Sequence, residues 1–153
     1  VGLFAGGVWG RMAAGEVPAV IEAACRKHQV AWGCENHGEK SIEEMGERFG
    51  GGAFPHCGLA LDTGWCGAQG IEALAALRRL RPFLKIVHLK DTEGPRGHGS
   101  CTLGDGIVGI EGVVRELKAT GFDGAVCLEH EPYDHDPSAD VAESLRRVQG
   151  WMG

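Results

Sequence analysis

Short apolar runs alternate with amphipathic segments along the whole chain, and this alternation limits the possible folds more than any other feature. The apolar runs have the length of β-strands, and the amphipathic segments carry apolar residues at helical spacing. Strands joined by helical crossovers favour parallel pairing within one sheet, so we expect an α/β fold. The expected strands are residues 1–5, 29–35, 57–62, 84–89 and 125–129, and the expected helices are 16–28, 42–49, 71–80, 110–120 and 139–151.

Four of the expected strands end in a residue that could bind a ligand. These residues are Glu35, Asp62, His88 and Glu129, and they recur at intervals of about one strand–helix unit, with a longer loop in the last interval. Since alternate residues of a strand point to the same face, His88 and Lys90 should share one side of their strand. Polar groups at the end of otherwise apolar strands indicate a site.

Convergence of ligands from four consecutive strands favours a closed (β/α) barrel over an open doubly wound sheet. In an open sheet ligands gather at one switch point, whereas the C-terminal face of a barrel collects residues from many strands. A complete eight-stranded barrel usually needs about 250 residues, and this chain has 153. We therefore predict a single domain, residues 1–153, that forms a partial (β/α)8 barrel of about five units. The expectation, favoured by a first residue other than Met, is the C-terminal part of a longer protein; the alternative is completion by another chain, as in a homo-oligomer.

Composition restricts the classes of partner. The net charge is -6, with 15 basic and 21 acidic residues and no long basic run, which argues against a protein that binds nucleic acid. No apolar run is long enough to cross a bilayer, and no signal peptide is recognisable, so we expect no membrane partner. The six cysteines form no CxxC pair, and we expect them to be reduced and the protein to be cytoplasmic.

Three carboxylates and one imidazole would make an oxygen-rich metal site. Such a donor set suits Mn²⁺, Mg²⁺ or Co²⁺ better than a thiolate-bound structural zinc, with Zn²⁺ as a further alternative. The competing interpretation is that each of the four residues only caps a helix or forms an ion pair in a loop.

Five motifs in order resemble the C-terminal half of the sugar phosphate isomerase/epimerase family, the xylose isomerase-like TIM barrels. The motifs are ENHG, LALDTGW, VHLKDT, LGDGIVGIEG and GFDGAVCLEHEP, and the opening VGLFAGG is similar to the fourth strand of that family. The resemblance extends from about residue 1 to residue 150. It implies strands four to eight of the barrel, with the N-terminal strands one to three missing.

The resemblance also implies a function. Matched motif by motif, the metal ligands of ketose 3-epimerases fall on Glu35, Asp62, His88 and Glu129, with the two glutamates as the catalytic acid/base pair. The implied activity is that of a divalent-metal-dependent isomerase or epimerase. Its substrate would be a sugar, sugar phosphate or keto acid, from which a carboxylate removes the proton beside the carbonyl to give a metal-stabilised enediolate.

One departure from the family affects the substrate. Ketose epimerases carry a His three residues after the aspartate of strand six, and this chain has Trp65 there, which can stack on a sugar but cannot exchange a proton. His37 and Lys90 are further candidate substrate contacts, Lys90 with an ion pair to Asp91 or Glu131 as the alternative. Arg96 and His98, in the long loop after strand seven, complete the candidate substrate-binding set.

The segment after the last strand carries several polar residues that we place outside the site. His130 should point away from the site if Glu129 points into it, towards helix packing, and Glu131 could orient a ligand. Residues 134–136 resemble a metal site by composition only, and we interpret them as a solvated loop.

Two other functions remain open from the sequence. The first is an apurinic-site endonuclease-like zinc hydrolase of the same superfamily, which would need additional histidines and a basic surface. The second is a truncated, non-catalytic half barrel that binds a partner.

Overall fold

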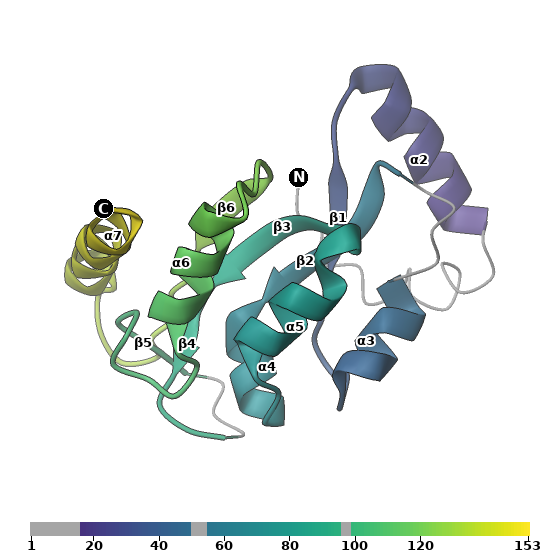
Figure 1. Ribbon diagram of the computed structural model, residues 1–153. Coiled ribbons are helices and arrows are strands. Elements are labelled where there is room, and N and C mark those ends of the chain that lie inside the picture. The colour runs from purple at the N-terminus through teal and green to yellow at the C-terminus, as the bar shows by residue number, and fades with distance from the viewer. Residues whose placement is uncertain (1–15, 50–54, 96–98) are drawn as a thin grey trace.

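Four parallel strands form the central sheet of the computed structural model, which describes residues 16–49, 55–95 and 99–153 (Figure 1). The strands are β1 (Trp32–Glu35), β2 (Cys57–Asp62), β3 (Leu84–Leu89) and β6 (Ala125–Leu128), and their order in the sheet is β1-β2-β3-β6. The order in space therefore follows the order in the chain, as in the wall of a barrel. The strand expected at residues 1–5 lies outside the described residues.

Six α-helices in the described ranges precede, connect or follow these strands. They are α2 (Glu16–His28), α3 (Ile42–Phe49), α4 (Thr63–Gln69), α5 (Ala73–Leu80), α6 (Ile110–Ala119) and α7 (Ser138–Met152), with a short 3-10 helix η1 (Arg81–Phe83) before β3. Helices α3, α5, α6 and α7 contact one another in that order, and α5 and α6 pass over one face of the sheet (Figure 1). The chain thus forms an α/β structure with a parallel sheet, and its fold is that of a partial barrel.

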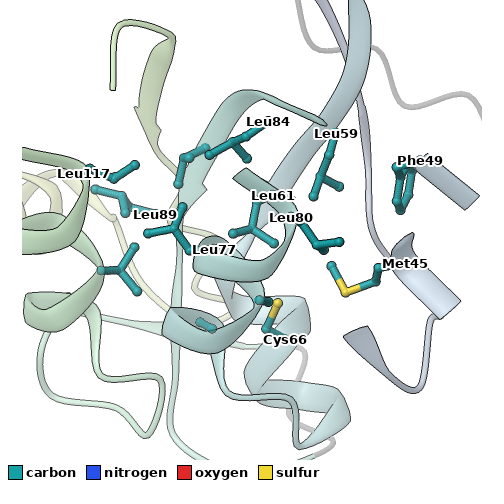
Figure 2. Packing of buried hydrophobic residues seen from close by; sticks show 14 of the residues in the cluster. Met45, Phe49, Leu59, Leu61, Cys66, Leu77, Leu80, Leu84, Leu89 and Leu117 are labelled. Atoms are coloured by element: carbon teal, nitrogen blue, oxygen red, sulfur yellow. The ribbon is translucent and has the colours of Figure 1, made fainter. Parts of the chain in front are cut away.

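The hydrophobic core lies between this face of the sheet and the helices. Leu59 and Leu61 of β2 and Leu89 of β3 contribute buried side chains, and Leu77 of α5 and Leu117 of α6 pack from the helix side (Figure 2). Alternate strand residues point to the opposite face, which is where His88 and Asp62 lie in register with each other. The alternation of side chains along each strand thus places the apolar residues in the core and the polar residues on the opposite face of the sheet.

Local signals explain where two of the helices begin and end. Ser41 Oγ accepts the Glu44 N–H at 3.1 Å, so Ser41 caps α3 as the sequence predicts. Gly121, with φ 61°, ends α6, and the Phe122 N–H returns to the Leu117 carbonyl at 3.0 Å.

Two features of the fold differ from the predicted elements. The helix expected at 71–80 begins at Ala73, and an additional helix, α4, precedes it. The long loop after β3 contains a small antiparallel hairpin, β4 (Asp91–Thr92) with β5 (Ser100–Cys101). Neither α4 nor the hairpin has apolar residues at regular helical or strand spacing, so the sequence pattern does not predict them.

The Asp91 carboxylate organises the loop that follows the hairpin. It is fully buried and accepts four backbone N–H groups at 2.9–3.1 Å, two on each oxygen, so an entire turn of chain folds around one side chain. The donors are Thr92, Gly104, Gly106 and Val108.

All six cysteines are free, as the sequence predicts. No helix in the described part of the chain combines the length and the apolar character needed to span a bilayer.

Candidate active site

Four side chains converge at the carboxyl ends of the four parallel strands. Glu35 ends β1, Asp62 ends β2, His88 lies in β3 and Glu129 directly follows β6. One potential ligand atom from each of them lies within 4.8 Å of the others. The residues that the sequence placed at strand ends therefore form one cluster, and all four face the side of the sheet opposite the helices.

The His88 imidazole lies between the two glutamates. Its Nδ1 is 2.7 Å from Glu35 Oε1 and 3.2 Å from Glu129 Oε2. Hydrogen bonds to Glu129 and Glu35 raise the pKa of His88 to about 10, and the bond to His88 is the main reason why the pKa of Glu129 falls to about 2. At neutral pH His88 is therefore an imidazolium that lies beside the Glu129 carboxylate.

Asp62 is buried without a full set of partners. Its Oδ1 accepts the Trp65 N–H at 2.8 Å at the start of α4, whereas its Oδ2 is buried and has no hydrogen-bond partner. Burial raises the pKa of Asp62 to about 7, and the charges of Glu129 and Glu35 add to this effect. A buried carboxylate oxygen that faces other acids is a position where a cation would be stabilised.

Asn36 fixes the ends of β1 and β2 to each other. Its Oδ1 accepts the Asp62 N–H at 2.8 Å, and its Nδ2 donates to the Asp62 carbonyl at 3.1 Å. The side chain is buried, so these bonds are shielded from water. Sequence reasoning missed Asn36, although an amide directly after the polar end of a strand was a possible signal.

Lys90 belongs to the site but is already paired. The residue is 5% exposed, and its Nζ donates to Glu129 Oε1 at 2.8 Å and also to Glu131 Oε2. Burial disfavours the ammonium, but these two bonds outweigh it and raise the pKa of Lys90. Of the two ion-pair partners considered for Lys90, Glu131 is present, while Asp91 instead binds backbone N–H groups.

The backbone of Lys90 and its side chain are positioned by the segment that follows β2. Thr63 Oγ1 accepts the Lys90 N–H at 2.9 Å and donates to the Lys90 carbonyl at 2.7 Å. The side-chain stem of Lys90 passes directly over Gly64, where an added Cβ would lie 2.6 Å from Lys90 Cγ. Thr63 and Gly64 at the start of α4 thus hold Lys90 in position: Thr63 binds its backbone, and Gly64 leaves room for its side chain.

The His37 and Trp65 rings are in contact with each other. Their ring centroids are 3.6 Å apart with a tilt of 40° between the rings. The turn that holds His37 is fixed by the buried Glu39, whose Oε2 accepts the His37 N–H at 2.7 Å and whose Oε1 pairs with Arg48 at 2.6 Å. Two of the predicted substrate contacts are therefore adjacent to each other.

The remaining predictions for the site have mixed outcomes. Arg96 and His98 lie outside the described residues. His130 points away from the cluster towards α7, as predicted, since its Nε2 is 3.0 Å from Asp140. Residues 134–136 lie exposed in the loop before α7, as predicted, and His135 pairs there with Asp134 and also reaches Asp140 on α7.

Comparison with known proteins agrees with this arrangement of strands. The sequence profile of the xylose isomerase-like TIM barrel matches residues 11–151, which is most of the chain. The chain belongs to this family. Among curated protein sequences, none matched it.

Several solved structures of this fold resemble the chain. A xylose isomerase domain protein from Planctomyces limnophilus has a TM-score of 0.73 at 23% identity and covers 98% of this chain. A D-tagatose 3-epimerase-like protein has a TM-score of 0.70 at 17% sequence identity and covers 88% of this chain. The IOLI protein with a bound zinc atom has a TM-score of 0.65 at 19% identity and also covers 88% of this chain. This chain spans 51–56% of the length of these three proteins.

Proposed function

We propose that this protein is a divalent-metal-dependent isomerase or epimerase of a sugar, a sugar phosphate or a related hydroxy-carbonyl compound. The observation that carries the proposal is the cluster of Glu35, Asp62, His88 and Glu129, whose potential ligand atoms lie within 4.8 Å of one another. Membership of the xylose isomerase-like family supports it, as do the solved relatives whose titles name epimerases.

The residues of the cluster fit a divalent cation. Asp62 Oδ2 is buried without a partner, and three acids at such short range repel one another unless a positive charge lies between them. In the metal-free arrangement the His88 imidazolium supplies part of that charge. A predominance of oxygen donors favours Mn²⁺, Mg²⁺ or Co²⁺, although the zinc bound by the IOLI protein keeps Zn²⁺ as a candidate.

In this proposal Glu35, Asp62, His88 and Glu129 hold the cation. The bound cation would polarise the oxygens of a hydroxy-carbonyl substrate and stabilise the negative charge that develops when a carbon-bound proton leaves. Glu129 and Glu35 are the acid/base pair. Bonds to His88 and Lys90 lower the pKa of Glu129 to about 2, so Glu129 is in the carboxylate form that a general base requires.

The surrounding residues have supporting roles. Lys90 holds Glu129 through its Nζ and keeps a positive charge next to the site. The rings of Trp65 and His37 offer a surface on which a sugar can stack and exclude water. Arg96 and His98 remain candidate substrate contacts from the loop after β3.

The cluster contains one imidazole and three carboxylates, a set poorer in histidine than a multinuclear zinc hydrolase needs. For that reason we favour the isomerase over the apurinic-site endonuclease-like alternative. A truncated half barrel without catalytic activity is distinguished from an enzyme by the experiment that follows.

The test is carbon-bound hydrogen exchange. The metal-loaded protein is incubated in D₂O with ketoses, their phosphates and hydroxypyruvate, and deuterium at the carbon beside the carbonyl is measured. Glu129→Gln should lower the rate on the accepted substrate by about 100-fold or more, because a positioned general base is lost. Glu93→Gln, an exposed acid in the loop after β3, is the matched control and should leave the rate unchanged.

Removal of the metal should abolish the exchange and re-addition of Mn²⁺, Mg²⁺ or Co²⁺ should restore it. Full activity and full metal content in Glu129→Gln would contradict the assignment, and a protein that binds no divalent ion would favour the non-catalytic alternative.

A further inference from the structure

A second group of potential ligands lies outside the active-site cluster, between β6 and α7. It consists of His130, just after β6, His135 in the following loop, and Asp140 in the first turn of α7. One potential ligand atom from each lies within 4.8 Å of the others. The spacing of these residues in the sequence does not predict the cluster, since the loop has to fold back for His135 to reach α7.

Both imidazoles direct the same nitrogen at one oxygen. His130 Nε2 is 3.0 Å and His135 Nε2 is 2.6 Å from Asp140 Oδ2. The two ring centroids are 6.5 Å apart, so the rings approach this oxygen from different sides without stacking. Two ring nitrogens and a carboxylate oxygen therefore meet at one point.

The other nitrogen of each ring is held by a polar group. His130 Nδ1 is 3.1 Å from Ser100 Oγ of β5, and His135 Nδ1 is 2.7 Å from Asp134 Oδ1. Partners of this kind on Nδ1 fix the tautomer that leaves Nε2 free to bind, as the outer partners of metal-bound histidines do. The His130 side chain is only 2% exposed, so its orientation is set by packing.

The electrostatics of the group without an ion are unusual for a surface loop. His135 lies between two carboxylates, and the hydrogen bonds to Asp140 and Asp134 raise its pKa. A single divalent ion would be bound by the same three atoms, His130 Nε2, His135 Nε2 and Asp140 Oδ2.

We propose that His130, His135 and Asp140 form a second metal site, selective for a borderline ion such as Zn²⁺, that fastens the loop after β6 to α7. Two imidazoles and one carboxylate are a common zinc donor set, in contrast to the oxygen-rich active-site cluster. The half-exposed His135 leaves the site open to solvent, so water completes the coordination. The inference does not rest on the proposed enzymatic function.

The test measures zinc in a background where the active-site cluster is disabled. The double variant Asp62→Asn with His88→Ala lacks two of the four active-site ligands, so zinc that remains reports on the second site. We expect one equivalent of Zn²⁺ by elemental analysis after dialysis. Adding His135→Ala should remove it, whereas His28→Ala, which removes an exposed histidine at the end of α2, should not.

Two further measurements separate ligation from folding. Zn²⁺ should slow amide hydrogen exchange in residues 130–140 of the background protein and should have no such effect after His135→Ala. Asp134→Asn, which changes only the partner of His135 Nδ1, should weaken Zn²⁺ binding by about tenfold.

The circular dichroism spectrum of every variant should match that of the wild type. Absence of zinc from the background protein, or zinc retained after His135→Ala, would overturn the proposal. Neither result would decide whether the active-site cluster binds its own metal.

Discussion

Asp62 is the residue at which stability and function are most clearly opposed. Its Oδ2 is buried without a partner, and its neighbours Glu35 and Glu129 are also acids. Folding without a metal therefore has to protonate Asp62 or bury an uncompensated charge. Because the pKa is about 7 in the folded protein and 3.8 as a reference, this cost is absent below pH 4, grows as the pH rises to 7, and is constant above that.

Replacing Asp62 by Asn should stabilise the metal-free protein while weakening metal binding at the active-site cluster. The amide keeps an oxygen for the Trp65 N–H and removes the buried charge, so the free energy of unfolding should increase by about 1 to 3 kcal/mol at pH 8. The gain should shrink towards zero near pH 4. Urea unfolding at several pH values in the presence of a chelator measures it.

Asp123→Asn, at an exposed position, is the control and should change little at any pH. A destabilised Asp62→Asn protein at pH 8 would show that the carboxylate is compensated by a partner and would weaken the metal assignment.

Individual ligands could be predicted because each one interrupts an apolar strand. Glu35, Asp62, His88 and Glu129 all lie at or near the end of an apolar run, and parallel pairing brings such positions together. The position of Asn36 directly after β1 was a possible signal, but its role could not be predicted, because that role depends on two hydrogen bonds to a residue 26 positions away. The same holds for Thr63, which acts on the backbone of a different strand.

The loop between β3 and α6 is the element that depends most on one side chain. All four hydrogen bonds to the Asp91 carboxylate come from backbone N–H groups, and three of those groups lie in the turn before α6. The loop begins next to Lys90, so its order also supports the active site.

Asp91→Asn should destabilise the protein by about 2 kcal/mol or more, because an amide nitrogen would face two backbone N–H groups in a buried position. Thermal unfolding measures the loss, and amide hydrogen exchange at residues 104, 106 and 108 should accelerate. Glu93→Gln, an exposed acid in the same loop, should change neither. Unchanged exchange in Asp91→Asn would mean that the loop is held by other contacts.

Elements with a strong apolar period were predicted to within a few residues, as α3, α6 and α7 show. Helix α4 was missed because its sequence, TGWCGAQ, contains two glycines and no amphipathic stripe. It is specified instead by the Asp62 cap at its start and by Gly70, with φ 73°, at its end. The β4–β5 hairpin has only two residues per strand, too few for a periodic signal.

At the scale of the molecule, the sheet ends at β6 in the described part of the chain. Strand β6 pairs only with β3, and three of its four residues are exposed. The chain covers 51–56% of solved relatives with the same fold. A strand with an unpaired edge and an apolar face attracts another strand.

The 153-residue chain should therefore self-associate through β6 as its concentration rises. Val126→Lys should weaken this association, because a charge on an edge strand opposes pairing. Sedimentation velocity across a concentration series measures it, with Val20→Lys on α2, another exposed valine, as the control. A monomer at every concentration would contradict the prediction, and equal effects of the two variants would assign the association to another surface.

The close approach of Lys90 to Gly64 has a consequence for how this sequence can evolve. A side chain at position 64 would collide with the stem of Lys90, so position 64 can change only after position 90 has lost its long side chain. That loss would leave Glu129 and Glu131 without their shared cation. Divergence at these positions has to proceed in a fixed order, and we expect glycine and lysine to be inherited together among homologues that keep this charge arrangement.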